Sequence, residues 1–270
     1  PSIAMMIFIS IYSVVDGLFV SNFAGKEALA AVNLVFPLVM ALGSVGFMFG
    51  TGGAALVAKT MGEGDQVRAN RLFSLIAVAG TALGIVLAGV GAGILGPLLE
   101  ALGAQGTLKD QGLAYGFILL AALPFSIMQN MFQSFFIAAE RPKVGLAVTI
   151  AAGVANIVLD YLFIAVLGWG IAGAALATAL GQALAAVAAV AFFASSKTSR
   201  LRFARPTADF RALGKTCVNG SSELMTEVAA SVVSMLYNYQ LMMIAGADGV
   251  AAYGVIMYVN FIFTAVFFGF

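Results

Sequence analysis

The sequence predicts an all-α membrane protein with several spans, and three observations lead to this fold class. Hydrophobic residues make up 62% of the chain and charged residues 9%, whereas soluble domains average about 45–50% and about 25%. The mean hydropathy is +1.04. The apolar residues form long runs without alternation, and such runs are helices because lipid offers the backbone no hydrogen-bond partners.

Eight apolar runs follow one another along the chain, each long enough for a helix of about 20 residues that crosses a bilayer. Their approximate bounds are 1–23, 31–58, 72–96, 113–138, 144–167, 171–194, 218–244 and 251–270. Pro37 and Pro124 lie well inside two of these runs, and we expect each to kink its helix. Three pairs of glycines have the spacing that allows close helix contact. They are Gly46 and Gly50, Gly80 and Gly84, and Gly89 and Gly93.

Lysine and arginine are unevenly distributed over the polar connectors. The second, fourth and sixth connectors hold 11 of the 13 basic residues, and the other side holds only Lys26 and Lys109. By the positive-inside rule the even-numbered connectors are cytoplasmic, the N-terminus is cytoplasmic and the first helix runs outward. We interpret the charge run of the sixth connector as solvated, without a binding role of its own.

The sixth connector is also the only long polar break, and it predicts the domain organisation. We expect a six-helix unit over 1–194, a cytoplasmic connector over 195–217, and the start of a second unit over 218–270. A short, weak match between 24–31 and 245–252 falls at equivalent turns and favours a parallel repeat. Because the chain begins and ends inside apolar runs, we expect a fragment; its first residues lack the features of a signal peptide.

Two aspartates interrupt apolar runs at the same predicted depth. Asp16 and Asp160 each lie roughly 10–12 Å below the outer end of an outward-running helix. Asn156, four residues before Asp160, points to the same face. Two carboxylates from separate helices at one depth can share a site. If they lie close together in a low dielectric, they cannot both be ionised and unpaired, so a proton or a cation must be held between them. The alternative is that each aspartate is separately hydrogen-bonded to the backbone or to an asparagine.

A second pair of acids, Glu223 and Glu227, lies four residues apart near the cytoplasmic end of the run over 218–244. Glu223 can extend to the membrane interface, whereas Glu227 lies deeper. Further polar residues within the runs include Tyr115, Asn130 and Thr178.

Several classes of function are excluded or disfavoured by the sequence. There is no histidine and a single cysteine, Cys217, so His-based and Cys-based metal sites are absent. No P-loop motif is present, so we expect no ATP binding, and no nucleic-acid partner either. The segment 168–173 fits G-x-G-x-x-G but joins two membrane runs, so we interpret it as a tight turn. Neither Asp16 nor Asp160 stands in the G-x-G-D signature of intramembrane proteases.

Five stretches, taken in order, resemble the multidrug and toxic compound extrusion (MATE) family, and most closely its bacterial DinF- and MepA-like branch. The stretches are YSVVDGLFVSNFAGKEALAAVNLVFPL, AAERPK, ANIVLDYLFI, GWGIAGAALATALGQ and NGSSELMTEVAASVVSMLYN. The resemblance implies twelve helices in two six-helix lobes, of which this chain would hold the N-lobe and two helices of the C-lobe. It also implies a non-enzymatic, cation-coupled antiporter of the bacterial inner membrane that exports cationic or amphipathic drugs.

The resemblance also implies roles for individual residues. The positions that match the family's cation-coupling site are Asp16, Asn156, Asp160 and Thr178. Tyr115 and Asn130 match further polar positions, and Glu223 and Glu227 are candidate C-lobe carboxylates. The coupling ion is H⁺ or Na⁺, with protons slightly favoured, and no other cofactor is expected. The alternative is a flippase for lipid-linked saccharides. Such a flippase would need Lys and Arg in its cavity to hold pyrophosphate, and none lies inside the eight runs.

Overall fold

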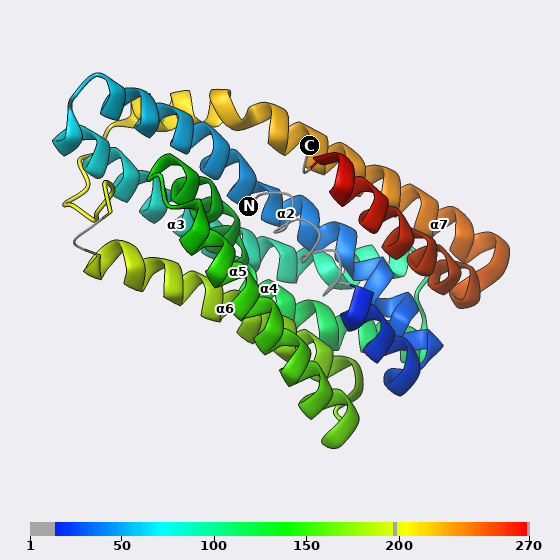
Figure 1. Ribbon diagram of the computed structural model, residues 1–270. Helices are drawn as coiled ribbons and strands as arrows, with labels where there is room; N and C mark the ends of the chain where they lie inside the picture. The colour runs from blue at the N-terminus through cyan, green and yellow to red at the C-terminus, as the bar shows by residue number, and fades with distance from the viewer. Residues whose placement is uncertain (1–13, 197–198, 269–270) are drawn as a thin grey trace.

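The computed structural model describes residues 14–196 and 199–268 (Figure 1), so the predicted helix over 1–23 is described only from Val14. The described residues form helices and no strand. Six of these helices are long and apolar enough to cross a membrane, and Val14–Ala24 is a shorter apolar helix. The predicted all-α, multi-span fold class is confirmed.

The helices follow the predicted runs, and some of them extend the runs by several residues. In order they are the π-helix η1 (Val20–Ala24), α2 (Lys26–Gly62), α3 (Gln66–Ala101), α4 (Gly106–Ala138), α5 (Pro142–Asp160), the π-helix η2 (Tyr161–Val166), α6 (Gly170–Ser195) and α7 (Phe210–Phe268). The extra residues are helical turns that flank the apolar parts. Asp65, for example, accepts a 2.9 Å hydrogen bond from the backbone N–H of Arg68 at the start of α3, and such caps continue a helix beyond its apolar part.

The element α7 consists of two helices that meet at Gly246. This residue has φ 61° and ψ −153°, a conformation that favours glycine. The break confirms the predicted division between 218–244 and 251–270. The first of the two helices begins at Phe210, earlier than predicted, because Asp209 caps it by accepting a 3.0 Å hydrogen bond from the N–H of Ala212.

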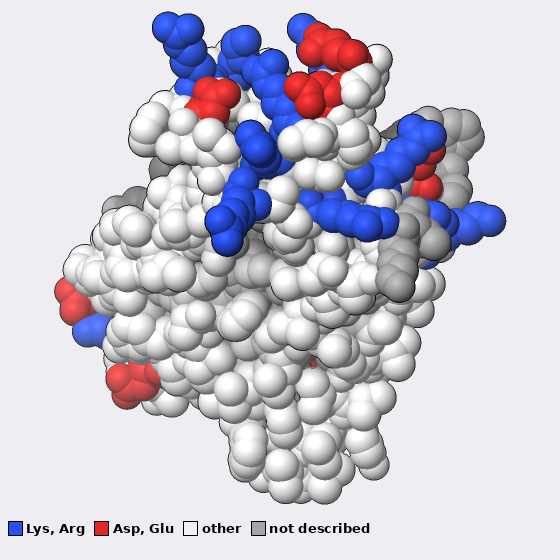
Figure 2. All heavy atoms as spheres, turned by 90° about the vertical axis from the view of Figure 1, so that its left-hand side faces the viewer, with Lys and Arg blue, Asp and Glu red and all other residues white. Residues whose placement is uncertain are grey.

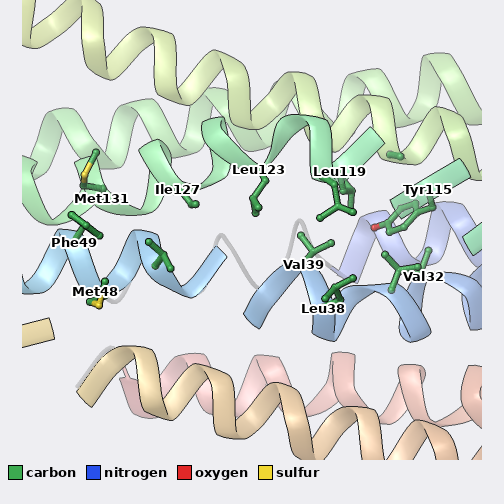
Figure 3. Packing of buried hydrophobic residues seen from close by; sticks show 14 of the residues in the cluster. Val32, Leu38, Val39, Met48, Phe49, Tyr115, Leu119, Leu123, Ile127 and Met131 are labelled. Atoms are coloured by element: carbon green, nitrogen blue, oxygen red, sulfur yellow. The ribbon is translucent and has the colours of Figure 1, made fainter. Parts of the chain in front are cut away.

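Helix α2 lies at the centre of the bundle and packs against α3, α4 and α7. Figure 3 shows side chains of α2, such as Val39 and Phe49, facing side chains of α4, such as Leu123 and Met131. Glycines bring the helices close together. A Cβ at Gly46 would lie 2.8 Å from the carbonyl oxygen of Ile127.

Two of the three predicted glycine contacts are confirmed. Gly46 and Gly50 face α4 from α2, and Gly80 and Gly84 face α4 from α3. The prediction is wrong for Gly89 and Gly93, because a Cβ at either would meet no described atom within 4 Å. Glycine spacing alone does not say which face of a helix is covered.

The segment between α6 and α7 is docked on α3, which the sequence interpretation missed. Its backbone bonds to side chains of three residues one turn apart on α3. The bonds are Gln66 Nε2 to the carbonyl of Arg200 (2.5 Å), the N–H of Arg202 to Asn70 Oδ1 (3.1 Å) and the N–H of Ala204 to Ser74 Oγ (2.8 Å). We call this contact, over 200–204, the docked connector.

Apolar side chains of the docked connector pack against the helices beneath it. Leu201 is fully buried. The ring of Phe203 lies 5.0 Å from that of Phe73, in a cluster that includes Phe132 and Phe193. The charge run itself is solvated, as interpreted, because the described basic residues of this segment are exposed. The docking of the apolar Leu201 and Phe203, which alternate with arginines, was not predicted.

Basic side chains gather at one end of the bundle, which is at the left of Figure 1. Figure 2 views the molecule from that side and shows Lys and Arg concentrated over the upper part of the face. The α2–α3 turn and the docked connector lie there. We call this end the basic end and the other, where η1 and η2 lie, the opposite end.

Candidate functional site

A π-helical segment follows each of the two predicted membrane aspartates. Asp16 lies in the helical turn before η1, and Asp160 is the last residue of α5, directly before η2. Both segments end on a bond that spans five residues: Gly25 N–H to the carbonyl of Val20 (3.1 Å) and Leu167 N–H to the carbonyl of Leu162 (2.9 Å). Short π-helical turns are rare and are frequent at functional sites.

The structure brings Asp16 and Asp160 together. Segment η1 packs against η2 and α6, and the two carboxyl groups lie within hydrogen-bonding reach of each other. Asp160 is fully buried, whereas Asp16 as a whole residue is half-buried. The predicted proximity of the two acids is therefore confirmed.

The polar atoms around this pair are buried and short of partners. Among the described residues, Asp16 Oδ1, both carboxyl oxygens of Asp160 and the Nδ2 of Asn156 make no well-formed hydrogen bond. Asn156 is 4% exposed and therefore lies on the buried side of α5, as predicted, without bonding Asp160 directly. Unpartnered buried polar groups are uncommon in proteins and call for an explanation such as a bound ion, proton or water.

Two more of the predicted residues lie at a similar depth. Thr178 is half-buried on α6, about 12 Å from the start of that helix, and α6 packs against both π-helical segments. Tyr115 is buried on α4, about 14 Å from the start of its helix, opposite Val32 of α2 (Figure 3). Thr178 thus lies on a helix that packs against both π-helical segments, and Tyr115 lies in the contact between α2 and α4.

Asn130 lies well away from this level. It is half-buried on α4, with its Cβ beside Gly46 of α2. It is about 22 Å farther along α4 than Tyr115, toward the basic end. A network that joins Asn130 to the aspartates would need intermediate groups along α4.

Glu223 and Glu227 are separate from the aspartate pair. Both are on the first helix of α7, nearer the basic end; Glu223 is exposed and Glu227 is half-buried. Glu227 is one heptad from Gly220, which touches α2, so it shares the face of α7 that is turned toward α2. The deeper placement of Glu227 agrees with the sequence prediction.

Two asparagines in the contact between α2 and α7, the half-buried Asn33 and the buried Asn238, were missed by the sequence analysis. Asn33 and Asn238 bond to each other across the two helices. The available signal was an amide inside an apolar run, since polar groups in lipid need partners. The sequence offered no way to match two residues so far apart in the chain.

The aspartate pair can hold a proton or a small cation. No group of three or more His, Cys, Asp or Glu side chains gathers in the described residues, so the pair supplies at most two carboxylates. One proton shared by the two carboxyl groups would satisfy the oxygens that face each other. A sodium ion would need further oxygens, and Asn156 and Thr178 carry side-chain oxygens on the neighbouring helices α5 and α6.

A bundle of membrane-length helices around a buried acidic pair is typical of ion-linked membrane transporters. The MatE family model matches residues 1–162, which is more than half of the chain, and the chain belongs to the MatE family. The resemblance to MATE proteins, predicted from the five stretches, is thereby confirmed.

Curated relatives include multidrug export proteins named MepA. The MepA of Staphylococcus saprophyticus subsp. saprophyticus is 25% identical over 200 residues, covering 73% of this chain and 44% of the relative. The MepA of Staphylococcus aureus (strain MRSA252) is 25% identical over 183 residues, covering 68% and 41%. The chain thus spans less than half the length of these relatives.

Solved structures of MATE transporters have the same fold. The multidrug transporter DinF-BH, solved in complex with a ligand, is 25% identical with a TM-score of 0.93, covering 100% of this chain and 60% of that one. A transporter of the MOP superfamily from Pyrococcus furiosus is 23% identical with a TM-score of 0.87, covering 99% and 60%. The described helices are therefore a MATE-type bundle that covers more than half of these folds.

Proposed function

We propose that this protein exports cationic or amphipathic small molecules in exchange for H⁺ or Na⁺, by alternating access across the membrane. The observation that carries the proposal is the contact between Asp16 and Asp160, in which Asp16 Oδ1 and both carboxyl oxygens of Asp160 are buried without a hydrogen-bond partner among the described residues. Relatives named multidrug export proteins and a neighbour named a multidrug transporter support small-molecule substrates. The proposal involves no covalent chemistry and no ATP.

In this mechanism the aspartate pair acts as the ion switch. Uptake of a proton or sodium ion removes the repulsion between the two carboxylates, so η1 and η2 can pack closely. Release of the ion restores that repulsion and favours separation of the first helix from α5. We propose that the basic end faces the cytoplasm of a bacterial cell and that the ion enters from the opposite end, which is nearer the pair.

The roles of the remaining polar residues follow from their positions. Asn156 and Thr178 would supply oxygens to a bound ion, and Tyr115 would border the site from α4. Asn130 would act farther along α4. Glu227, and less directly Glu223, would attract a cationic substrate from the α7 side, because a buried carboxylate in a membrane seeks a positive partner.

Transport of a fluorescent organic cation by the intact protein in liposomes tests this function under separate proton and sodium gradients. We expect uptake or release driven by one gradient and abolished by an ionophore that collapses it. Transport under neither gradient would overturn the proposal. The flippase alternative predicts movement of a lipid-linked saccharide instead, and it is disfavoured because basic residues lie near helix ends in the described spans.

A further inference from the structure

Helix α2 runs antiparallel to the first helix of α7 and also touches the second, with close contacts at both ends. At the basic end, Gly52 of α2 meets the backbone of Thr216, and Gly220 meets the backbone of Met48. At the opposite end, Asn33 of α2 meets Asn238, Val250 and Gly254. We use the word seam for this α2–α7 contact.

The contact at the basic end is made by packing. A Cβ on Gly52 would overlap the carbonyl oxygen of Thr216, and a Cβ on Gly220 would overlap that of Met48. Thr216 is fully buried there, and its hydroxyl has no hydrogen-bond partner among the described residues. Closing this end therefore leaves one polar group unsatisfied, which favours reopening to water.

The contact at the opposite end is made by side-chain amides. Asn238 Nδ2 donates a 2.6 Å hydrogen bond to the backbone carbonyl of Asn33. Asn33 Nδ2 in turn donates a 3.3 Å hydrogen bond to the carbonyl of Val250, beyond the break at Gly246. Asn33 therefore ties α2 to both helices of α7 at once. The ion pair of Lys26 and Asp248, at 3.9 Å, lies outside it and is highly exposed.

We propose that Asn33 and Asn238 form a latch that holds the opposite end of the seam closed, and that they are gating residues of the transporter. The two ends differ in chemistry: opening the opposite end breaks two interhelical amide hydrogen bonds, whereas opening the basic end separates glycine-lined backbones. The latch would release when substrate leaves on that side. This inference rests on the proposed function, but its structural part can be measured without transport.

The test measures water access to the seam from each side of the membrane. Cys217 is replaced by Ser, and Ser231, which is 4% exposed and one heptad from Asn238 on the same helix face, is replaced by Cys as a reporter. A membrane-impermeant thiol reagent is applied to the intact protein in sided vesicles. The rate of labelling from each side is then compared between variants.

We expect Asn238→Ala to speed labelling from the opposite end by about threefold to fifteenfold, the shift expected for loss of one interhelical hydrogen bond in a membrane. Asn33→Ala, which removes the bond to Val250, should act in the same direction, and the double variant more strongly. Labelling from the basic end should not rise. The matched control is Asn22→Ala, because Asn22 bonds only the local carbonyl of Leu18 at that end.

A cross-link provides the second arm. With both Asn33 and Asn238 replaced by Cys and joined by a short linker that is attached through a disulfide bond at each end, labelling from the opposite end should stop and transport should cease. Both should recover when a reductant cleaves the disulfides. Unchanged labelling in the alanine variants, or equal acceleration from both sides, would overturn the latch. If labelling changes as expected while the unsubstituted protein moves no substrate under either gradient, the latch stands and the proposed function fails.

Discussion

The carboxyl groups of Asp16 and Asp160 lie within hydrogen-bonding reach of each other, although one comes from the first helix and the other from the end of α5. Each is followed by a π-helical segment, and these segments pack together at the opposite end of the bundle. Both helices therefore widen into a π-helical turn beyond their aspartate. The pair is therefore a meeting point of two irregular helices.

Replacing either acid by its amide tests the pair. We expect Asp16→Asn and Asp160→Asn each to reduce ion-driven efflux by at least about tenfold, because an amide cannot gain or lose the exchanged charge. Efflux of a fluorescent cation from cells or liposomes measures this. The control is Asp110→Asn, on the exposed start of α4, which should transport normally. Full transport by both pair variants would contradict the assigned role.

The glycine contacts between α2 and α4 predict a difference between two chemically identical substitutions. Gly46→Val should destabilise the bundle by about 1–3 kcal/mol, because its side chain would press on the backbone of Ile127. Gly89→Val should change stability by less than about 0.5 kcal/mol, because no described atom lies near its Cβ. Thermal unfolding in detergent compares the two. Equal effects would mean that the helices do not pack as described.

The docked connector predicts an aromatic anchor. Phe203→Ala should destabilise the protein by about 2 kcal/mol, less than the 3–5 kcal/mol typical of a fully buried phenylalanine, because Phe203 is 37% exposed. Phe210→Ala is the matched control, since Phe210 is 82% exposed at the start of α7. The same unfolding assay applies. If Phe203→Ala did not change the stability, the ring of Phe203 would not hold the segment in place.

The polar side of the docked connector can be tested separately. Ser74 Oγ accepts the N–H of Ala204 while donating to the carbonyl of Asn70. Ser74→Ala should leave that N–H without its acceptor and cost about 1 kcal/mol locally. Hydrogen exchange of the peptide over 199–209 should then speed up by about fivefold. Thr81→Ala, whose hydroxyl bonds only the local carbonyl of Ala77, should leave that peptide unchanged.

The sequence predicted the positions of the helices, their direction across the membrane and the aspartate pair. These features can be recognised because a membrane protein has long apolar runs, in which an isolated charge stands out. The matched depths of Asp16 and Asp160 followed from counting residues along two helices that run the same way. The roles assigned to the site residues stay predictions. What could not be predicted were contacts that depend on helix rotation, such as the open faces at Gly89 and Gly93.

Long-range polar pairing was also out of reach of the sequence. Asn33 and Asn238 are inconspicuous singly, and only the packing of α2 on α7 shows that they meet. The docked connector had a visible signal, the alternation of Leu201 and Phe203 with arginines. Its high charge suggested a solvated segment instead, because charged residues dominate the composition of so short a stretch.

The docking of the connector limits how far the start of α7 can move away from α3. The backbone is fixed to α3 at Ala204 by Ser74, and α7 is capped at Asp209. The residues between them, fully extended at about 3.3–3.6 Å each, reach roughly 17 Å. As long as the connector stays docked, the start of α7 cannot travel farther than this from its anchor, however large the rearrangement elsewhere in the bundle.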